Sequence, residues 1–446
     1  MKRNLIDRLP DAVLVSVVTF LPFKEAVRTS VLARKWRYFW VFNRVLDFDG
    51  SKTVYRLRGR RDELQEERIN FVDWVNRVLS LHSSETLDEF RLLFNLNMNN
   101  IKDINNWIEF SFKKRVKKLD LNFAENAFIR FEEGAPYNFP NVYHLHIFRL
   151  TWESLVSLRL TEVCLDSHCL ELFISKCPSL EELHIENPIK FFSFKTSPEM
   201  IRLKRLVIIS SITFKSLEIC SPNLVSCTCR IILDTFKIEL KDVSSLTSLS
   251  LRRMSLGDLC NSLCKVSRTF SSLETLSLLP ITIRGLDSWR QFPNLPGLKK
   301  LVFDVDLNHF GSLLFFTPLL NAAPSLREIV MKLEFSPRLV ERRGRRPYKG
   351  EEHRCLQVLD IQGYASVDAC PEVIIYVLEN ASSFERLIIN GKVMSGDVLD
   401  LLKSKLDSET CVKDVTDIIF PDDATNRSIY MNEINNWRAL FSRRGY

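Results

Sequence analysis

Apolar residues at the start of the chain are spaced as they are on one face of a helix. They recur at intervals of three and four residues, at Val13, Leu14, Val17, Val18 and Leu21. Pro10 and Asp11 are typical of a helix start, and Pro22 closes the pattern. The sequence therefore predicts a first helix between these two prolines.

Two further short helices are predicted after Pro22. The second carries Ala26 and Val27, and the third begins at a Ser30 cap. The large apolar residues of the third helix share one side, at Leu32, Trp36, Phe39 and Trp40. Three helices of this size cannot enclose so much apolar surface, so either the rest of the chain or another protein must cover it.

Beyond residue 115 the pattern L-x-x-L-x-L, or an aliphatic or aromatic equivalent, returns along the chain. Its middle position falls at residues 119, 158, 183, 249, 276, 301, 329 and 359, in steps of 39, 25, 66, 27, 25, 28 and 30. The long gaps contain weaker copies, VYHLHI from Val142 and LKRLVI from Leu203. A recurrence of ~20–29 residues is the period of a leucine-rich repeat, in which each copy buries its strand only by stacking on its neighbours.

The alternation within each copy predicts which side chains face outward. The leucines enter the core of a parallel sheet, and the residues between them form an outward row, the expected binding surface, at Asp120, Arg159, His184 and Ser277. The Asn or Cys expected after the last leucine is missing, so no regular ladder should support the turns. The 13-residue step from Leu145 to Leu158 predicts a tight, irregular turn. An α/β domain without repeats is the alternative.

Further elements are predicted on both sides of the repeats. INFVDWVNRVLSL from Ile69 predicts an amphipathic helix and FRLLFNL from Phe90 a strand, together the expected first turn of the solenoid. Residues 355–391 predict strand, helix and strand, with Pro371 at the helix start. We expect this unit to close the open edge of the sheet. Its buried helix face is predicted at Val373, Ile374, Val377 and Leu378, and its last strand contains Leu387 and Ile389.

The N-terminal helices carry a specific order of residues: Leu9-Pro10, Leu14, Leu21-Pro22, Ala26, Ser30-Val31-Leu32, Trp36-Arg37 and Trp40. This order resembles the F-box, the adaptor-docking motif of cullin-based ubiquitin ligases. The resemblance implies that a Skp-type adaptor covers the exposed face. The contact residues that it implies are Leu9, Pro10, Leu14, Leu21, Pro22, Val31, Leu32 and Trp36. Trp36 and Trp40 are alternatively part of an internal core, and Ala33 stands where the family often has Ser.

The C-terminal segment carries a second such order: Leu359, Ile361, Gly363, Leu378-Glu379-Asn380-Ala381, Phe384, Leu387 and Ile389. It resembles the FBD domain that follows leucine-rich repeats in many plant F-box proteins. The expected fold class is α/β, with a small three-helix F-box and an irregular leucine-rich-repeat solenoid that the FBD closes. The expected boundaries are 1–50 for the F-box, 65–345 for the repeats, 350–425 for the FBD and 426–446 for a tail.

Positive charge is concentrated at the N-terminus. The chain has a formal net charge of +7, and residues 1–61 contain 14 Lys or Arg against 5 Asp or Glu, an excess of +9. This excess favours an acidic partner surface, protein or nucleic acid. Basic clusters at residues 56–61 and 341–350 are read as nuclear addresses, phosphate-binding patches or plain solvated loops. A non-ligase module that binds nucleic acid through them is therefore the alternative function.

Metal-binding and catalytic patterns are weak. The eleven cysteines lack a framework spacing, which is typical of free thiols in a reducing compartment. Cys164, His168 and Cys169 form the nearest metal-like group, but their spacing is poor for zinc, and Cys227 and Cys229 fit ordinary apolar strand positions. The sequence contains no nucleophile, P-loop or dinucleotide motif. It predicts a protein that is not an enzyme and needs no cofactor.

The expected function is that of the substrate-recognition subunit of an SCF-type (cullin-RING) ubiquitin ligase. The F-box would dock the Skp-type adaptor, and through it a cullin scaffold, while repeats and FBD hold a protein substrate. No apolar run reaches the ~18 residues that cross a bilayer, and no targeting peptide is expected, so the expected location is the nucleus or cytoplasm. Membrane and nucleic acid are not expected partners, and a small-ligand receptor is a third reading.

Overall fold

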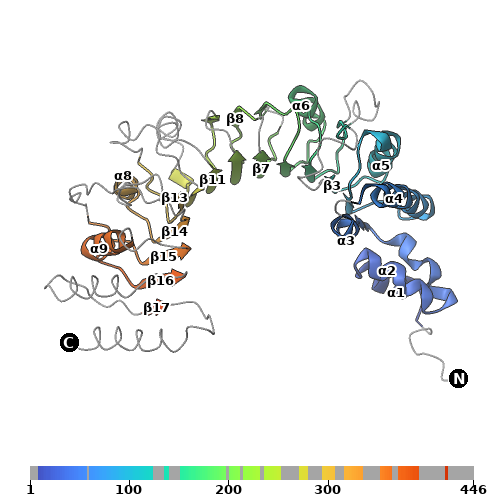
Figure 1. The fold of residues 1–446 in the computed structure, drawn as a ribbon, viewed down its shortest axis with the longest axis horizontal. Helices are drawn as coiled ribbons and strands as arrows, with labels where there is room; N and C mark the ends of the chain where they lie inside the picture. The colour runs from blue at the N-terminus through green and yellow to red at the C-terminus, as the bar shows by residue number, and fades with distance from the viewer. Residues whose placement is uncertain are drawn as a thin grey trace. The chain divides into compact units, whose positions relative to one another are not determined.

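The computed structural model in Figure 1 divides the chain into two compact units, Met1–Ser221 and Pro222–Tyr446. The structure describes residues 9–57, 60–123, 135–139, 151–196, 200–210, 214–231, 236–252, 271–279, 294–306, 316–334, 352–363, 370–390 and 417–419.

Short helices open the first unit, as predicted, but the last of them is not an α-helix. The segments are α1 (Asp11–Thr19), α2 (Phe23–Arg28) and two 3-10 helices, η2 (Thr29–Val31) and η3 (Arg34–Phe42). The chain is extended at Ala33, directly before η3, and the Ser30 hydroxyl is buried without a hydrogen-bond partner. The predicted cap at Ser30 is therefore wrong, and Leu32 lies outside the helix in which it was expected.

Parallel strands form the sheet of the first unit, and each pairs in register with the next. They are β1 (Val45–Asp49), β2 (Glu89–Leu93), β3 (Lys118–Asn122), β4 (Ser157–Thr161), β5 (Glu182–Glu186) and β7 (Arg205–Ser210). The leucines predicted for the repeats are direct register partners, from Leu119 through Leu158 and Leu183 to Leu206. The repeat pattern is confirmed here, including the weaker copy from Leu203.

Helical crossovers connect several of these strands, as parallel pairing requires. The elements between the strands are α3 (Ser51–Arg56), α4 (Arg61–Leu81), η4 (Met98–Asn100), α5 (Ile101–Lys113) and α6 (Ser167–Ser175). Two short strands, β6 (Ser193–Lys195) and β8 (Ser216–Cys220), pair with each other outside the main sheet. Trp107 of α5 and Phe173 of α6 are fully buried, so these helices supply large side chains to the core.

Two expectations about the repeats are wrong. The strand at Phe90 is confirmed as β2, but it is not the first, because β1 already pairs with it in register. Leu158 follows Leu119 in the sheet, since β3 pairs directly with β4. The 13-residue step from Leu145 is thus not a step between neighbouring strands of this sheet, and the segment from Val142 lies outside the described residues.

The second unit continues the same architecture. Its strands are β9 (Ser226–Ile231), β10 (Lys237–Lys241), β11 (Ser248–Arg252), β12 (Thr275–Leu279), β13 (Lys300–Asp306), β14 (Glu328–Glu334), β15 (Val358–Gly363), β16 (Arg386–Asn390) and β17 (Asp417–Ile419). All except β10 form one parallel sheet in this order, in which the predicted Leu249, Leu276 and Leu301 are partners. Figure 1 shows α8 (Thr317–Asn321) and α9 (Cys370–Asn380) on the same side of these strands.

The predicted strand, helix and strand near the C-terminus are β15, α9 and β16. Val373, Ile374 and Val377 are buried as expected, whereas Leu378 is half-buried. β16 pairs with a further strand, β17. β17 (Asp417–Ile419) lies within the expected FBD bounds of 350–425 and is the last strand of this sheet among the described residues, in agreement with an FBD that closes the sheet.

Candidate adaptor-docking site

The first helix, α1, has two apolar stripes with different surroundings. Leu14 and Val18 are fully buried, whereas Val13 and Val17 lie at the surface. The sequence pattern placed all four on one face. Each pair has the i, i+4 spacing of a separate stripe, and the core of the chain covers only one of them.

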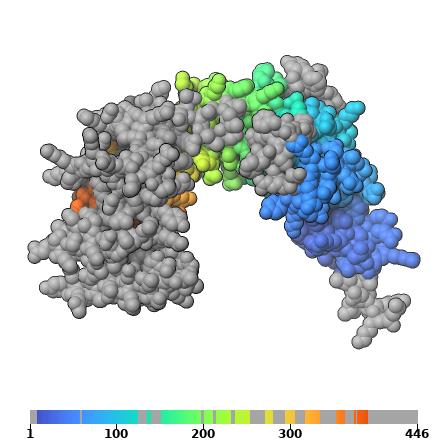
Figure 2. Space-filling view, in the orientation of Figure 1, coloured from blue at the N-terminus to red at the C-terminus, as the bar shows by residue number. Residues whose placement is uncertain are grey.

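The exposed stripe is accompanied by larger apolar side chains from the segments that follow. Phe20, Val31 and Leu32 are 88%, 86% and 68% exposed, and Leu9 is also at the surface. Figure 2 shows this part of the chain, in dark blue, at one end of the first unit. Exposed apolar residues gathered in one short segment are typical of a protein-docking surface. We call Leu9, Val13, Val17, Phe20, Val31 and Leu32 the exposed apolar set.

The eight predicted adaptor contacts divide by exposure. Leu21 is half-buried, while Leu14 and Trp36 are buried in the core of the chain; the exposed ones are Leu9, Pro10, Pro22, Val31 and Leu32. Contact with an adaptor stays a prediction for all eight. Trp36 and Trp40 are both buried, in agreement with the alternative that they belong to an internal core.

Sequence reasoning did not separate the exposed from the buried apolar residues of the first helix. It placed Val13 and Val17 on one face with Leu14 and Val18, and it did not single out Phe20. The two valines form an i, i+4 pair beside the pair of Leu14 and Val18. Together the four residues make an apolar stripe that is too wide for one small core to cover, and this width was the sequence signal that part of the stripe is exposed. Phe20 lies directly after α1, where helical periodicity no longer applies.

An aromatic cluster beneath these helices connects them to the sheet. The ring of Phe23 packs edge-on against Trp40 and Phe48, with centroids 6.3 and 5.4 Å apart. Phe48 lies on β1 and also contacts Trp74 of α4, at 5.1 Å between centroids. The N-terminal helices and β1 thus share one core.

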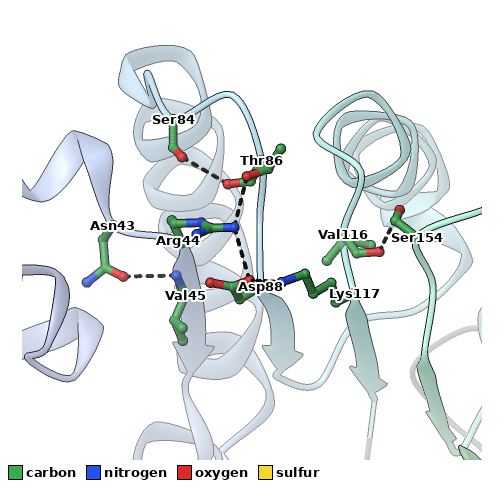
Figure 3. A network of polar contacts seen from close by, with 9 residues as sticks. All are labelled: Asn43, Arg44, Val45, Ser84, Thr86, Asp88, Val116, Lys117 and Ser154. Atoms are coloured by element: carbon green, nitrogen blue, oxygen red, sulfur yellow. Dashed lines mark hydrogen bonds and ion pairs between the residues drawn. The ribbon is translucent and has the colours of Figure 1, made fainter. Parts of the chain in front are cut away.

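A network of polar contacts around Asn43, Arg44, Asp88 and Lys117, which we call the polar joint, reinforces this connection (Figure 3). Asn43 is fully buried, and its Oδ1 accepts a hydrogen bond of 2.9 Å from the Val45 N–H. Arg44 Nη2 lies 3.2 Å from Asp88 Oδ1, which also pairs with Lys117 Nζ at 2.8 Å. The joint therefore connects the segment after η3 to the starts of β2 and β3.

His82 adds a buried contact to the same joint. Its Nε2 lies 2.9 Å from the carbonyl oxygen of Asn43. Since a carbonyl oxygen can only accept, Nε2 carries the proton. Burial lowers the pKa of His82, with Lys114 acting in the same direction, so the ring is neutral at physiological pH.

The start of α1 is fixed by a lysine from η3. Lys35 Nζ pairs with Asp11 Oδ1 at 2.8 Å and donates to the Leu9 carbonyl at 2.9 Å. Lys24 of α2 donates to the Asp49 carbonyl at 2.7 Å. These contacts hold the backbone that presents the exposed apolar set.

From Asp47 to Arg159, the outward row of the first unit alternates in charge. Asp47, Arg91, Asp120, Arg159 and His184 are successive register partners. Arg91 lies 3.5 Å from the carboxylates of both Asp47 and Asp120. Burial raises the pKa of Asp120 to about 6, against the opposing effect of Arg159 and Arg91. The predicted outward direction of Asp120, Arg159 and His184 is confirmed. Arg159 is exposed, and the other members of the row are partly buried.

The candidate metal-binding and thiol residues form no metal site in the described part of the chain. There, no three His, Cys, Asp or Glu residues are grouped to hold a metal ion. The described cysteines, among them Cys164 and Cys169, are free thiols. Cys227 and Cys229 are buried on one face of β9, as predicted, and burial raises the pKa of Cys227 to about 12. That thiol is therefore protonated and unreactive.

The first basic cluster is partly neutralised by nearby acids. Arg56 lies 3.8 Å from Glu67, and Arg60 lies 3.4 Å from Glu63. The second cluster, at 341–350, lies outside the described residues. As for the membrane, no helix in the described ranges combines the length and the apolar character needed to span one.

Sequence comparison places these features in a family. The F-box domain model matches residues 6–46, and the model described as "At1g61320/AtMIF1, LRR domain" matches residues 142–427. The second match covers more than half of the chain. The chain belongs to the family of leucine-rich-repeat proteins that this model describes, and its N-terminal helices are an F-box.

Relatives from Arabidopsis thaliana combine the same domains. The FBD-associated F-box protein At5g22730 is 24% identical over 92% of this chain and 93% of its own length. The F-box/LRR-repeat protein At4g14096 is 31% identical over 50% of the chain and 49% of its own length. The putative F-box/LRR-repeat protein At3g59230 is 29% identical, and that match covers only 44% of the relative. The chain thus spans about half the length, or less, of several relatives, and the expected plant F-box, repeat and FBD resemblance is confirmed.

Proposed function

We propose that the chain is the substrate-recognition subunit of an SCF-type ubiquitin ligase. Its F-box docks a Skp-type adaptor and through it a cullin scaffold, and the outward rows of the repeats, with the FBD segment, hold a target protein. F-box/LRR proteins are generally receptors without catalytic activity. The chain accelerates ubiquitin transfer only by raising the effective concentration of the target near the transferring enzyme. This role places it in the nucleus or cytoplasm.

The observation that carries the proposal is the exposed apolar set above a well-packed core. Burying an apolar side chain such as Phe20, Val31 or Leu32 contributes roughly 1.5–3 kcal/mol each. Three such residues supply enough to offset much of the cost of association. The aromatic cluster and the polar joint keep the docked helices in a fixed relation to the first repeat strands, which is what positioning a target requires.

The test is a calorimetric titration of the full chain with a purified plant Skp-type adaptor. Val31→Asp and Leu32→Asp place a charge in the docked surface, and we expect each to weaken binding at least about 100-fold. Both side chains are exposed in the free chain, so the thermal unfolding temperature should not change. Leu9→Ala with Pro10→Ala should reduce affinity less, because no charge is buried.

Ile69→Asp is the matched control. Ile69 is 56% exposed on α4, outside the exposed apolar set, so its substitution should leave adaptor binding unchanged. Wild-type affinity in both Val31→Asp and Leu32→Asp would contradict the proposal. Leu14→Asp does not serve this purpose, because Leu14 is fully buried and its replacement unfolds the helices.

A further inference from the structure

Two arginines of the second unit lie side by side, and neither has an acidic partner among the residues that the structure describes. Arg230 of β9 and Arg252 of β11 are direct register partners on adjacent parallel strands, so their Cα atoms are about 4.8 Å apart. Both side chains are exposed, and neither makes a hydrogen bond or ion pair with any residue that the structure describes. Like charges directly opposite each other destabilise a sheet. An anion between them would remove this repulsion.

Several other basic residues on the outward faces are paired across strands. Arg205 of β7 lies 3.1 Å from Glu182, and Lys300 of β13 lies 2.8 Å from Glu328. Arg91 contacts a carboxylate on each side. Arg230 and Arg252 have no such carboxylate partner among the described residues. Within this part of the chain their two positive charges are available to a ligand.

Hydroxyl side chains occupy the outward positions that precede the two arginines. They form two rows of three in register across β9, β11 and β12, at Ser226, Ser248 and Thr275, and at Thr228, Ser250 and Ser277. All are half-buried, and none makes a side-chain hydrogen bond within the described ranges. Such hydroxyls both donate and accept, so they suit the backbone and polar groups of a peptide. We call these residues, with Arg230 and Arg252, the arginine–hydroxyl patch.

We propose that the arginine–hydroxyl patch binds a phosphorylated side chain of the target protein. A guanidinium presents parallel N–H donors that match two phosphate oxygens, and two guanidinium groups match the charge of a phosphate monoester, about −1.5 to −2 at pH 7. A carboxylate carries only half of that charge. The hydroxyl rows hold the peptide on one side of the phosphate. The inference rests on the proposed function, and it names the chemistry by which the repeats select a target.

The test uses the full chain and two synthetic peptide libraries, one with a fixed central phosphoserine and one with serine at that position. We expect the phosphoserine library to bind at least about tenfold more tightly, because its dianion makes charge-assisted hydrogen bonds. Arg230→Gln and Arg252→Gln should each remove most of this preference. Arg327→Gln, at an exposed arginine of the same unit just before β14, is the matched control and should retain it. Thermal unfolding of all variants should equal that of the wild type.

Equal binding of the two libraries overturns the proposal, as does a preference that survives in both patch variants. Inorganic phosphate that binds as tightly as the phosphopeptide overturns the role of the hydroxyl rows. Single-stranded RNA that binds through the same arginines in place of the peptide also contradicts it. No adaptor is present in this assay, so its outcome is separate from that of the adaptor titration.

Discussion

At Asp120, burial outweighs the attraction of two arginines. One carboxylate oxygen lies 3.5 Å from Arg91 Nε, and the other is buried without a hydrogen-bond partner. Burial raises the pKa of Asp120 to about 6; Arg159 and Arg91 oppose this shift, while Glu89 and Asp47 add to it. The charged form of this side chain therefore destabilises the folded state at neutral pH.

Replacing Asp120 by Asn should stabilise the first unit at neutral pH. Between the unfolded-state pKa of about 3.9 and the folded value, the folded state binds more protons, so stability falls as pH rises through this window. Asp120→Asn removes that loss, and we expect a gain of about 1 kcal/mol at pH 7, after discounting the lost attraction to Arg91. Denaturant unfolding at several pH values measures both effects.

Asp73→Asn is the control for this change. Asp73 is an exposed carboxylate on α4, so its substitution should leave the pH profile of stability unaltered. If the stability of the Asp120→Asn variant depended on pH with the same slope as that of the wild type, burial of the Asp120 charge would not destabilise the folded state as proposed. The alternation of leucines predicted the outward direction of Asp120. Its burial was not predictable, since it depends on side chains of strands 29 residues earlier and 39 residues later in the chain.

Among the elements, the segment between η3 and β1 connects the F-box to the repeats. Asn43 bonds in three directions there: its Oδ1 to the Val45 N–H, its Nδ2 to the Leu21 carbonyl at 3.4 Å, and its own carbonyl to His82. Asn43→Ala leaves the Leu21 and Val45 backbone groups without this partner, so we expect a loss of about 1–3 kcal/mol. Hydrogen exchange should quicken in η3 and β1 before it does in β4 or β5.

Asn99→Ala provides the comparison for the joint, because Asn99 is exposed in η4 and its side chain makes no described hydrogen bond. Exchange that quickens equally in all strands would show that Asn43 contributes only to global stability. Helical spacing in the sequence predicted three short helices at this end. It did not distinguish a 3-10 helix from an α-helix, because the spacing of apolar residues over one short segment fits both.

Across the whole molecule, the order of the strands could be predicted from the sequence because each repeat contains its own copy of the leucine pattern. The register partners of Leu249, Leu276 and Leu301 follow directly from that pattern. β1 was missed because its sequence, VLDFD, has a single leucine and lies next to the F-box. Its membership in the sheet is set by pairing with β2 and by the Gly50 N–H, which donates to the Leu93 carbonyl at 2.8 Å.

The position of β1 predicts how the chain tolerates truncation. A chain that starts at Arg44 keeps β1, whereas one that starts at Ser51 removes it and leaves β2 as an unpaired edge. We expect the shorter chain to aggregate more, as measured by light scattering at equal concentration. Equal aggregation of the two chains would show that β1 does not protect the edge. Both should fail to bind the adaptor, since both lack the F-box helices.

Pairing only between consecutive strands has an evolutionary consequence. Among the described residues of the second unit, each strand from β11 to β16 pairs only with the strands before and after it in the sheet. A gene duplication that copies one coil would insert a strand without disturbing any other partnership. Lineages can therefore lengthen or shorten the outward surface of the repeats coil by coil, while the partnerships of the remaining strands are inherited intact.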